Sequence, residues 1–311
     1  MRRSYRNDRL FHRLTLACAA IVVAMFVGII CSLTVGAWPA IRAFGLPFLW
    51  TEAWNPVTEK FGALAPIYGT LVTSAIAMLF AVPIGIGIAI FLTELCPRPL
   101  RRPIGIAVEL LAGIPSIIYG IWGLFVLAPV LQQSVMPWLI ARFEGVPVLS
   151  SLFAGPPYGI GIFTAGLILA IMTLPFISAI TRDVFEAVPP VLKEAAYGLG
   201  ATTWEVLWNV VLPYARAGVV GGVMLALGRA LGETMAVTFV IGNAHRIATS
   251  LLAPGTTISA AIANEFTEAI GDLYGPALIE LGLILFLVTV VVLAVAQLML
   301  HRLELRAGGR T

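Results

Sequence analysis

The sequence predicts an all-α protein that crosses a membrane six times, and its composition and apolar runs lead to this fold class. Hydrophobic residues make up 59% of the 311 residues and charged residues only 11%, with a mean hydropathy of +0.98. Because soluble domains are roughly half apolar, this composition indicates a polytopic membrane protein. Six apolar runs each reach the ~20 residues that a membrane-spanning helix needs. The runs cover residues 14–35, 68–93, 110–136, 160–181, 217–244 and 281–300.

The first run follows five arginines, an arrangement that also occurs in signal peptides. Its 22 residues exceed the length of a usual cleavable core, and no small-x-small cleavage site follows it. We therefore expect this run to be retained as the first span. With the first external loop it forms an amino-terminal region, residues 1–67, ahead of the main membrane region, residues 68–300, and a tail, residues 301–311.

Basic residues are distributed unevenly over the connections between the spans. If the amino terminus is inside the cell, the inside segments hold 14 Lys and Arg residues and the outside segments hold four. Such residues favour the cytoplasmic side of a membrane. Both termini and the polar segment 194–213 are therefore predicted to be cytoplasmic.

The predicted external segments are long. Residues 36–66 contain three tryptophans and four prolines, which suits short interfacial helices at the level of the lipid headgroups. Residues 245–276 predict a short helix that Thr256 or Thr257 caps. Composition does not separate loops that close a path or dock a soluble partner from loops that only cover the interface.

Proline and glycine fall in mid-membrane in spans two, three and five, as at Pro83 and Pro115. We expect broken helices there, which membranes tolerate where the helix packs on protein or lines a polar path. In span five, Gly218 and Gly222 are four residues apart, so a neighbouring helix can approach closely. Helix packing and a substrate path explain these glycines equally well.

Two charged residues, Arg229 and Glu233, interrupt span five near its centre. A charge there costs from about 2.5 to over 10 kcal/mol, so it indicates a functional role. At a four-residue spacing the two side chains share a helix face and can pair. One interpretation is a buried ion pair that holds two helices together. The other is an anion path, in which the planar guanidinium binds the oxygens of phosphate, sulfate or carboxylate and Glu233 orients it or tests the anion's protonation.

Thr234 and Thr238 follow in the same segment and can add hydroxyl groups near the path. Taken singly, a threonine in a helix more often donates to a backbone carbonyl of its own helix. Both residues are kept as candidate path residues.

No catalytic, metal or nucleic-acid site is expected. The histidines and the cysteines form no zinc pattern, and no disulfide framework is present. There is no GxxxxGK[ST] phosphate loop and no basic run interleaved with aromatic residues. We therefore expect a non-enzymatic chain without a cofactor, whose energy comes from another subunit or from a gradient.

Segment 194–213 carries the strongest motif. It reads Glu194-Ala195-Ala196, three residues, Gly200, nine residues, then Val210-Val211-Leu212-Pro213. This resembles the EAA signature of the permease subunits of bacterial ABC importers, with Val210 in place of isoleucine. The resemblance implies a type I ABC importer permease fold and a helix that seats in a cleft of an ATPase. Gly200 would make a tight turn, and Pro213 would end the segment and direct the chain into span five. An interfacial helix without a partner is the alternative.

Further stretches resemble the permease subunits of phosphate importers in particular: residues 109–123, which include Ser116 as a candidate path residue, residues 226–237 and residues 55–70. Two related permease types exist in such importers, and the external loop with Trp54-Asn55-Pro56 favours one of them. The resemblance implies an inner-membrane assembly of this chain, a second permease subunit, two ATPase subunits that bind ATP and magnesium, and an external phosphate-binding protein.

Alternatives to phosphate import remain from the residues alone. Sulfate and molybdate are also tetrahedral oxyanions, and Arg229 alone does not reject them. A gradient-driven secondary anion transporter would show inverted repeats and would not need segment 194–213.

Overall fold

The computed structural model describes residues 2–308, and within this range the chain is helical without β-strands. The helices are α1 (Arg2–Phe44), α2 (Leu64–Ile90), α3 (Arg98–Ala112), α4 (Ser116–Trp122), α5 (Ala128–Val130), α6 (Met136–Phe143), α7 (Leu149–Leu152), α8 (Ile162–Glu186), α9 (Pro190–Gly198), α10 (Thr203–Val206), α11 (Leu212–Leu231), α12 (Met235–Thr238), α13 (Ile258–Glu265) and α14 (Tyr274–Gly308). Shorter helical turns are η1 (Leu46–Leu49), η2 (Phe91–Leu95), η3 (Gly123–Leu127), η4 (Leu131–Val135) and η5 (Leu207–Val211).

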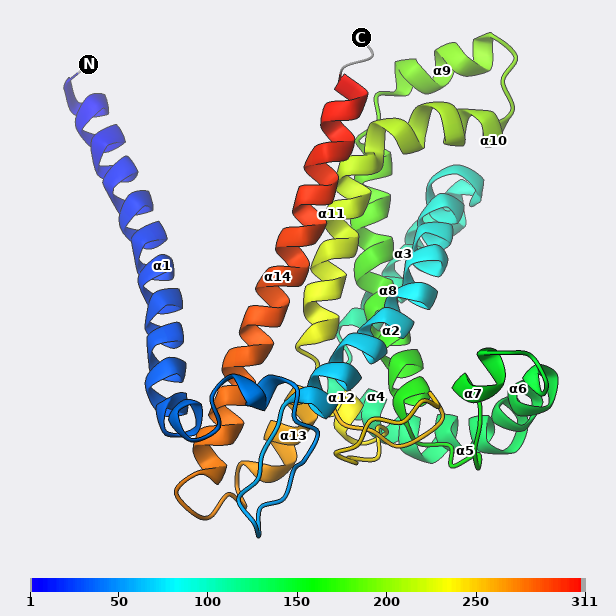
Figure 1. Ribbon diagram of the computed structural model, residues 1–311. Helices are drawn as coiled ribbons and strands as arrows, with labels where there is room; N and C mark the ends of the chain where they lie inside the picture. Colours follow the sequence, from blue (N-terminus) through cyan, green and yellow to red (C-terminus); the bar gives the residue numbers. More distant parts are fainter. Residues whose placement is uncertain (1, 309–311) are drawn as a thin grey trace.

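Six helical segments of the described chain are long and apolar enough to cross a membrane, which confirms the expected number. They are Leu10–Phe44, Leu64–Leu95, Ser116–Phe143, Ile162–Glu186, Thr203–Leu231 and Tyr274–Leu298. Figure 1 shows most of them running along the bundle, whereas Ser116–Phe143 curves across the end opposite the α9–α10 pair. Both ends of the chain lie at the same end of the bundle as the α9–α10 pair.

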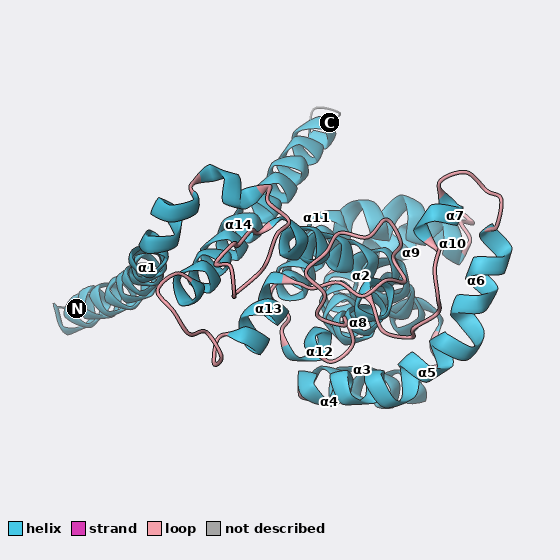
Figure 2. Cartoon of the chain, turned by 60° about the horizontal axis from the view of Figure 1, so that its bottom comes forward, coloured by secondary structure: helices cyan, strands magenta, loops and turns pink. Residues whose placement is uncertain are grey.

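α8 lies at the centre of the bundle (Figures 1 and 2), and 72% of the residues in its most apolar stretch are buried. It packs against α2 and α11, and glycines allow the close approach: a Cβ on Gly85 of α2 would lie 2.8 Å from Ile177 of α8. α1 contacts α14 through its carboxyl-terminal half and diverges from the bundle towards the amino terminus (Figure 1). None of the residues in its most apolar stretch is buried. Most of α1 is therefore uncovered in a single chain.

The second and third expected spans differ from the observed helices, as does the fifth, which is described with the candidate site. The third span begins at Ser116 and not at residue 110, because the chain leaves α3 at Gly113 and Pro115 starts a new helix. The second span is not broken: α2 runs through Pro83 without interruption. Proline is tolerated within a transmembrane helix because neighbouring groups satisfy the carbonyl that it leaves free.

The segments that are expected to be external lie at the other end of the bundle from the α9–α10 pair (Figure 1), and Figure 2 looks onto them. The short helix expected there is α13, and Thr257 caps it by accepting a hydrogen bond from the amide of Ala260 at 3.2 Å. Between α1 and α2, the described chain forms only the η1 turn in place of the expected interfacial helices.

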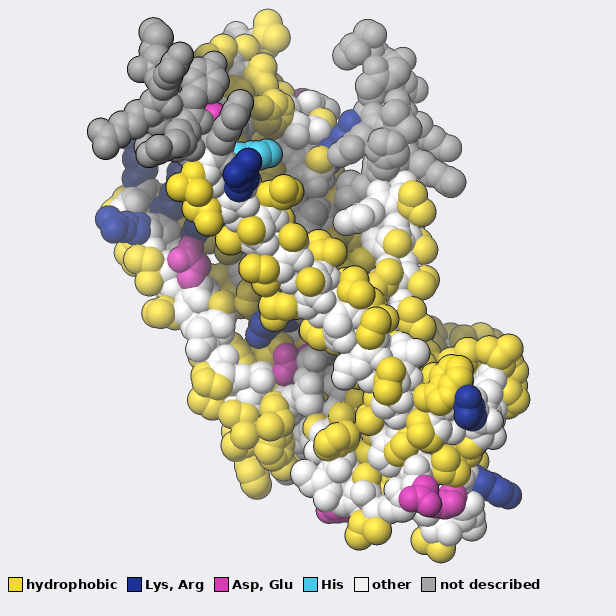
Figure 3. Space-filling view, turned by 90° about the vertical axis from the view of Figure 1, so that its left-hand side faces the viewer, with side chains coloured by type: hydrophobic (Ala, Val, Ile, Leu, Met, Phe, Trp, Pro, Cys, Tyr) yellow, Lys and Arg dark blue, Asp and Glu magenta, His cyan; other side chains and the backbone are white. Residues whose placement is uncertain are grey.

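Figure 3 shows a face that is largely hydrophobic along the spans, with charged side chains mainly towards the two ends and a smaller charged group at mid-height. The predicted tail, residues 301–311, continues α14 as far as Gly308, and residues 309–311 lie outside the described part. Several arginines in the basic count also lie where side chains are not described. They are Arg2, Arg3, Arg6, Arg9, Arg302, Arg306 and Arg310.

Candidate functional site

The candidate anion site lies where the fifth span is interrupted. α11 ends at Leu231, Gly232 leaves the helical conformation with φ −94° and ψ 1°, and the short helix α12 begins at Met235. The expected span over residues 217–244 is therefore a helix that ends within the membrane region, followed by irregular chain. Such breaks occur in membranes where the backbone is enclosed by protein or lines a polar cavity.

Arg229 lies in the last turn of α11, and its guanidinium carbon is 4.5 Å from the centre of the Phe176 ring. Phe176 is near the middle of α8, so the charge lies at mid-depth in the bundle. The ring face and the partial negative charge of the α11 carboxyl end each stabilise the cation by about 1 kcal/mol. Arg229 is nevertheless exposed in the single chain, so neither contact encloses it.

Glu233 lies beyond the end of α11 and does not share a helix face with Arg229. Its carboxylate accepts a hydrogen bond from the amide of Ala236 at 3.5 Å, at the start of α12. Among the described residues it forms no ion pair with Arg229, so the expected pairing is wrong for this conformation. Gly232 is the physical reason, because glycine costs about 1 kcal/mol in a helix relative to alanine and favours ending it.

The two threonines donate to backbone carbonyls. The hydroxyl of Thr234 lies 3.3 Å from the carbonyl oxygen of Gly232, and that of Thr238 donates to the carbonyl of Thr234 at 2.8 Å. The backbone interaction weighed for single threonines is thus present. Both side chains remain partly exposed, and their hydroxyl oxygens are able to accept a further hydrogen bond.

Ser116 is the first residue of α4, which packs against α12. A Cβ on Gly120 of α4 would lie 3.1 Å from the carbonyl oxygen of Met235, so only glycine permits this approach. The structure therefore brings the helix that begins at Ser116 into contact with the segment that follows Thr234, while Arg229 contacts α8.

The α9–α10 hairpin, residues 190–213, contains the EAA motif and projects from one end of the bundle (Figure 1). α9 ends in a Schellman motif. The amide of Gly200 donates to the carbonyl of Tyr197 at 2.9 Å, and the amide of Ala201 donates to the carbonyl of Ala196 at 3.1 Å. Gly200 has φ +88°, a conformation that glycine adopts at little cost, so the expected turn is confirmed. In this motif the carbonyl of Ala196 accepts a bond from the amide of Ala201, and the residue just before that amide has a positive φ. The turn therefore requires a glycine four residues after the second alanine of the EAA motif.

α10 begins with a capping box, in which Thr202 and Glu205 each bond the other's backbone amide. From Thr203 the helix continues without a break to Leu231. Pro213 therefore does not end the segment, contrary to the expectation. The π-helical turn η5 directly precedes it, and this wider turn accommodates the proline ring.

The hairpin surface is unusually apolar for a polar segment. Leu199 at its tip is 91% exposed, and Val191 and Trp204 are also exposed. Of the EAA residues, Glu194 and Ala195 are exposed as well. The last two residues of the motif, Leu212 and Pro213, form the start of α11. Lys193 of the hairpin forms an ion pair with Glu94 of η2 at 2.6 Å. That contact, which the sequence did not suggest, fixes the hairpin against the end of the second span.

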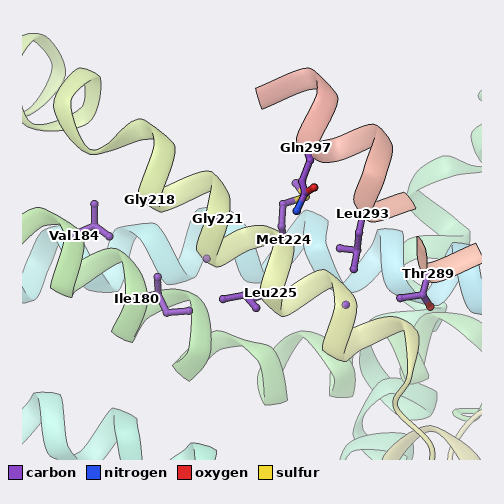
Figure 4. A pocket seen from close by; sticks show the side chains of 11 residues that line it. Ile180, Val184, Gly218, Gly221, Met224, Leu225, Thr289, Leu293 and Gln297 are labelled. Carbon is purple, nitrogen blue, oxygen red and sulfur yellow. The ribbon is translucent and has the colours of Figure 1, made fainter. Parts of the chain in front are cut away.

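A groove of about 780 Å³ lies between α8, α11 and α14 (Figure 4). Gly218 and Gly222 of α11 pack closely on Val184 and Ile180 of α8 at its edge, which supports the packing interpretation of these glycines. Its lining is glycine and apolar side chains apart from Thr289 and Gln297. The lining therefore contains no cationic side chain.

A second polar cluster, at the end of the bundle opposite the hairpin, was not expected from the sequence. Glu265 of α13 accepts hydrogen bonds from Trp54 at 2.7 Å and Tyr274 at 2.6 Å, and one of its oxygens lies 2.6 Å from Nε2 of His245. The rings of Trp54 and His245 stack at 4.8 Å. Burial by itself raises the pKa of Glu265, but its bonds to His245, Tyr274 and Trp54 together hold that pKa below the ordinary value.

No group of three or more metal-ligating side chains exists among the residues that the structure describes. The path residues and the hairpin are the candidate functional features of this chain, and the helix Thr203–Leu231 joins α10 of the hairpin to Arg229.

Residues 81–306 match the protein family described as binding-protein-dependent transport system inner membrane component. The chain is 68% identical over 309 residues to the phosphate transport system permease protein PstC of Mesorhizobium japonicum, covering 99% of this chain and 94% of that protein. It is 58% identical over 303 residues to PstC of Pasteurella multocida, covering 97% and 94%.

Among solved structures, a bacterial alginate ABC transporter in complex with an alginate pentasaccharide-bound periplasmic protein contains a similar chain. The TM-score is 0.61 at 19% identity, and the match covers 93% of this chain and 94% of that chain. At this identity the likeness concerns the fold alone.

Proposed function

The chain belongs to the family of inner membrane components of binding-protein-dependent transport systems, and we propose that it is the permease subunit of an ATP-driven importer of inorganic phosphate. It crosses the inner membrane with six helices. The observation that supports phosphate as the substrate is the 68% identity, over nearly the whole chain, to a phosphate transport permease.

Membership of this family implies a partner ATPase and a substrate-binding protein. We propose the specific assembly: this chain with a PstA-like permease, two PstB-like ATPase subunits and an external PstS-like phosphate-binding protein. ATP and magnesium bind to the ATPase subunits, and this chain has no catalytic step. Both termini and the α9–α10 hairpin face the cytoplasm.

In the proposed mechanism Arg229 faces the path between the two permease subunits and binds phosphate. Its exposure at mid-depth supports this role, because a guanidinium that faced lipid would be strongly destabilised. Its planar fork bonds two phosphate oxygens at once. Glu233 lies on irregular chain just beyond the end of α11 and accepts a hydrogen bond from the hydroxyl that phosphate still carries at neutral pH. Thr234, Thr238 and Ser116 contribute hydroxyl groups along the same path.

Coupling follows from the continuity of the helix. The exposed apolar tip of the hairpin docks in a cleft of the ATPase, since large exposed apolar patches usually mark binding surfaces. Closure of the ATPase pair on ATP moves the hairpin as a rigid body. Because α10, η5 and α11 form one uninterrupted helix, this movement reaches Arg229 directly.

The test is ATP hydrolysis by the reconstituted complex, with the binding protein loaded with phosphate and with sulfate and molybdate as competitors. We expect phosphate to stimulate hydrolysis and transport, and the two competitors to do neither. Equal stimulation by sulfate or molybdate would contradict the phosphate assignment, and stimulation by none of the three would contradict anion import.

A further inference from the structure

A second cationic site lies far from Arg229, at the end of the bundle that carries the hairpin. A cavity of about 340 Å³ separates the start of α3 from the end of α8. Its charged lining comprises Arg98, Arg101, Arg102 and Arg182, together with Glu109 and Glu186. In Figure 1, α3 begins close to the α9–α10 hairpin.

The carboxylates near this cavity neutralise only part of its positive charge. Glu109 bonds Arg182 at 2.7 Å, and Asp183 contacts the same guanidinium at 3.2 Å. Among the described residues, Arg98 and Arg102 form no ion pair with a carboxylate. Among the described residues Glu186, the other carboxylate of the lining, also forms no ion pair, so the four arginines and two glutamates of the lining leave an excess of positive charge.

Arg101, which also lines the cavity, likewise forms no ion pair with a described carboxylate. Its Nη2 donates to the carbonyl of Thr93 at 2.6 Å, which holds the side chain in place. Its Nε is buried and has no hydrogen-bond partner. A buried donor of a charged group costs about 1–3 kcal/mol when it is left unsatisfied. Because Nε has almost no accessible surface, an anion in the cavity would bond the other N–H groups of this guanidinium.

The position of these arginines on α3 adds a separate argument. They lie within the first five residues of a 15-residue helix, whose first turn has no acidic residue and whose N-cap, Pro97, has no side-chain acceptor. The amino end of a helix carries partial positive charge, so basic side chains are unfavourable there. A bound anion would offset both the helix end and the arginines.

Helix packing holds the far wall of the cavity in place. Arg182 reaches from α8 across α3 at Gly105, where a Cβ would lie 3.0 Å from its Nη1. The guanidinium is thus held between the two helices before any ligand arrives. Such preorganisation favours binding because less side-chain freedom is lost.

We propose that this cavity binds a phosphate-bearing anion, either the headgroup of an anionic phospholipid or inorganic phosphate. Arginine forks match phosphate oxygens, and basic pockets between spans at the cytoplasmic surface suit lipid phosphates. Three of the four guanidinium groups lack a carboxylate partner among the described residues, which supports an anion from outside the chain. Arg229 is not part of the lining of this cavity.

Hydrogen exchange over residues 98–106 of the full-length chain, within its complex in nanodiscs of neutral lipid, tests the site. One arm adds phosphatidylglycerol to the nanodiscs, and another adds inorganic phosphate to the buffer. A third adds chloride at equal ionic strength. The Arg98→Gln/Arg102→Gln variant removes two exposed, unpaired charges, and Arg216→Gln on α11 removes one elsewhere as the control.

We expect one of the two phosphate arms to slow exchange in the wild-type chain and in Arg216→Gln. Protection by phosphatidylglycerol alone identifies a lipid headgroup site, and protection by inorganic phosphate identifies a free-anion site. In the double variant the apparent affinity should fall by about tenfold for each guanidinium removed. The proposal is overturned if neither arm protects this segment, if chloride protects it equally, or if the double variant keeps full protection.

Discussion

At the residue scale, Arg229 combines a charge at mid-depth in the membrane with contacts that do not enclose it. Phe176 covers one face of the guanidinium at 4.5 Å, and the remainder is exposed in the single chain. The pairing with Glu233 that residue spacing suggested does not form in this conformation. Glu233 instead bonds the start of α12.

We predict that Arg229→Gln abolishes phosphate uptake while the complex still assembles. Loss of one charge-assisted bond costs about 1.5–3 kcal/mol, which is roughly 10- to 100-fold in binding. The lost contact with Phe176 costs only about 1 kcal/mol, so folding should survive. Phosphate uptake and co-purification of the partner subunits are the measurements. Arg216→Gln is the matched control, and uptake near the wild-type rate in Arg229→Gln would exclude the proposed role.

Gly200 has a different requirement, which concerns backbone conformation and not space. Its φ is +88°, and a Cβ added there would meet no packed atom within 4 Å. Asparagine adopts this region more readily than other side chains, whereas a β-branched residue is strained there.

We therefore predict that Gly200→Val destabilises the hairpin by about 1–3 kcal/mol, and that Gly200→Asn has a much smaller effect. ATPase co-purification and coupled hydrolysis should fall in the valine variant and persist in the asparagine variant. Equal loss in both variants would show that the position serves contact with the partner and not the turn.

At the scale of elements, one helix from Thr203 to Leu231 joins the hairpin to the candidate path. Its direction changes at η5, just before Pro213 (Figure 1). The ion pair between Lys193 and Glu94 attaches the hairpin to the second span. The side chains are 20% and 11% exposed, so solvent screens the pair only in part.

Breaking this pair should loosen the hairpin. We predict that Glu94→Gln lowers the free energy of unfolding by about 2 kcal/mol and reduces the number of phosphate ions transported per ATP hydrolysed. Thermal unfolding and a coupled transport assay are the measurements. The charge-swapped variant, Glu94→Lys with Lys193→Glu, should recover most of the loss. If it recovers none, the pair itself does not hold the hairpin.

At the scale of the whole molecule, the cluster around Glu265 connects segments that are far apart in sequence. It joins the loop after α1, the segment before α13, α13 itself and the start of α14. Phe61 and Tyr274 also stack at 5.2 Å beside it. These contacts hold the external segments together around a single carboxylate.

The lowered pKa of Glu265 makes this connection sensitive to acid. The carboxylate stabilises the fold above its ordinary pKa of 4.5, and the contribution is lost as the pH falls through the lowered value. We predict that the melting temperature of the wild-type protein drops in this acidic window. Glu265→Gln should be less stable at neutral pH and should show a smaller drop there. An unchanged pH profile in this variant would contradict the assignment.

The arrangement of six spans predicts the orientation of the whole chain. A fluorescent protein fused after the carboxyl terminus should fluoresce, and alkaline phosphatase fused in the loop near Gly155 should be active, because the first functions inside the cell and the second outside. The reverse pattern would overturn the cytoplasmic placement of the termini and the hairpin.

The sequence by itself determined the class of fold, the number of spans and the EAA turn. These depend on local or nearly local properties: the length of the apolar runs, and a glycine that must follow Ala196 at a set distance. Each is read from neighbouring residues, so no knowledge of packing was needed.

The tertiary structure decided where helices end and which charged groups meet. It ended α11 at Gly232, carried α2 through Pro83 and continued the helix through Pro213. It also paired Lys193 with Glu94 and gathered the arginines of α3 beside Arg182. Contacts of this kind join residues about 80 to 100 positions apart, and they depend on how helices pack, because a single helix does not determine which neighbour covers its charges.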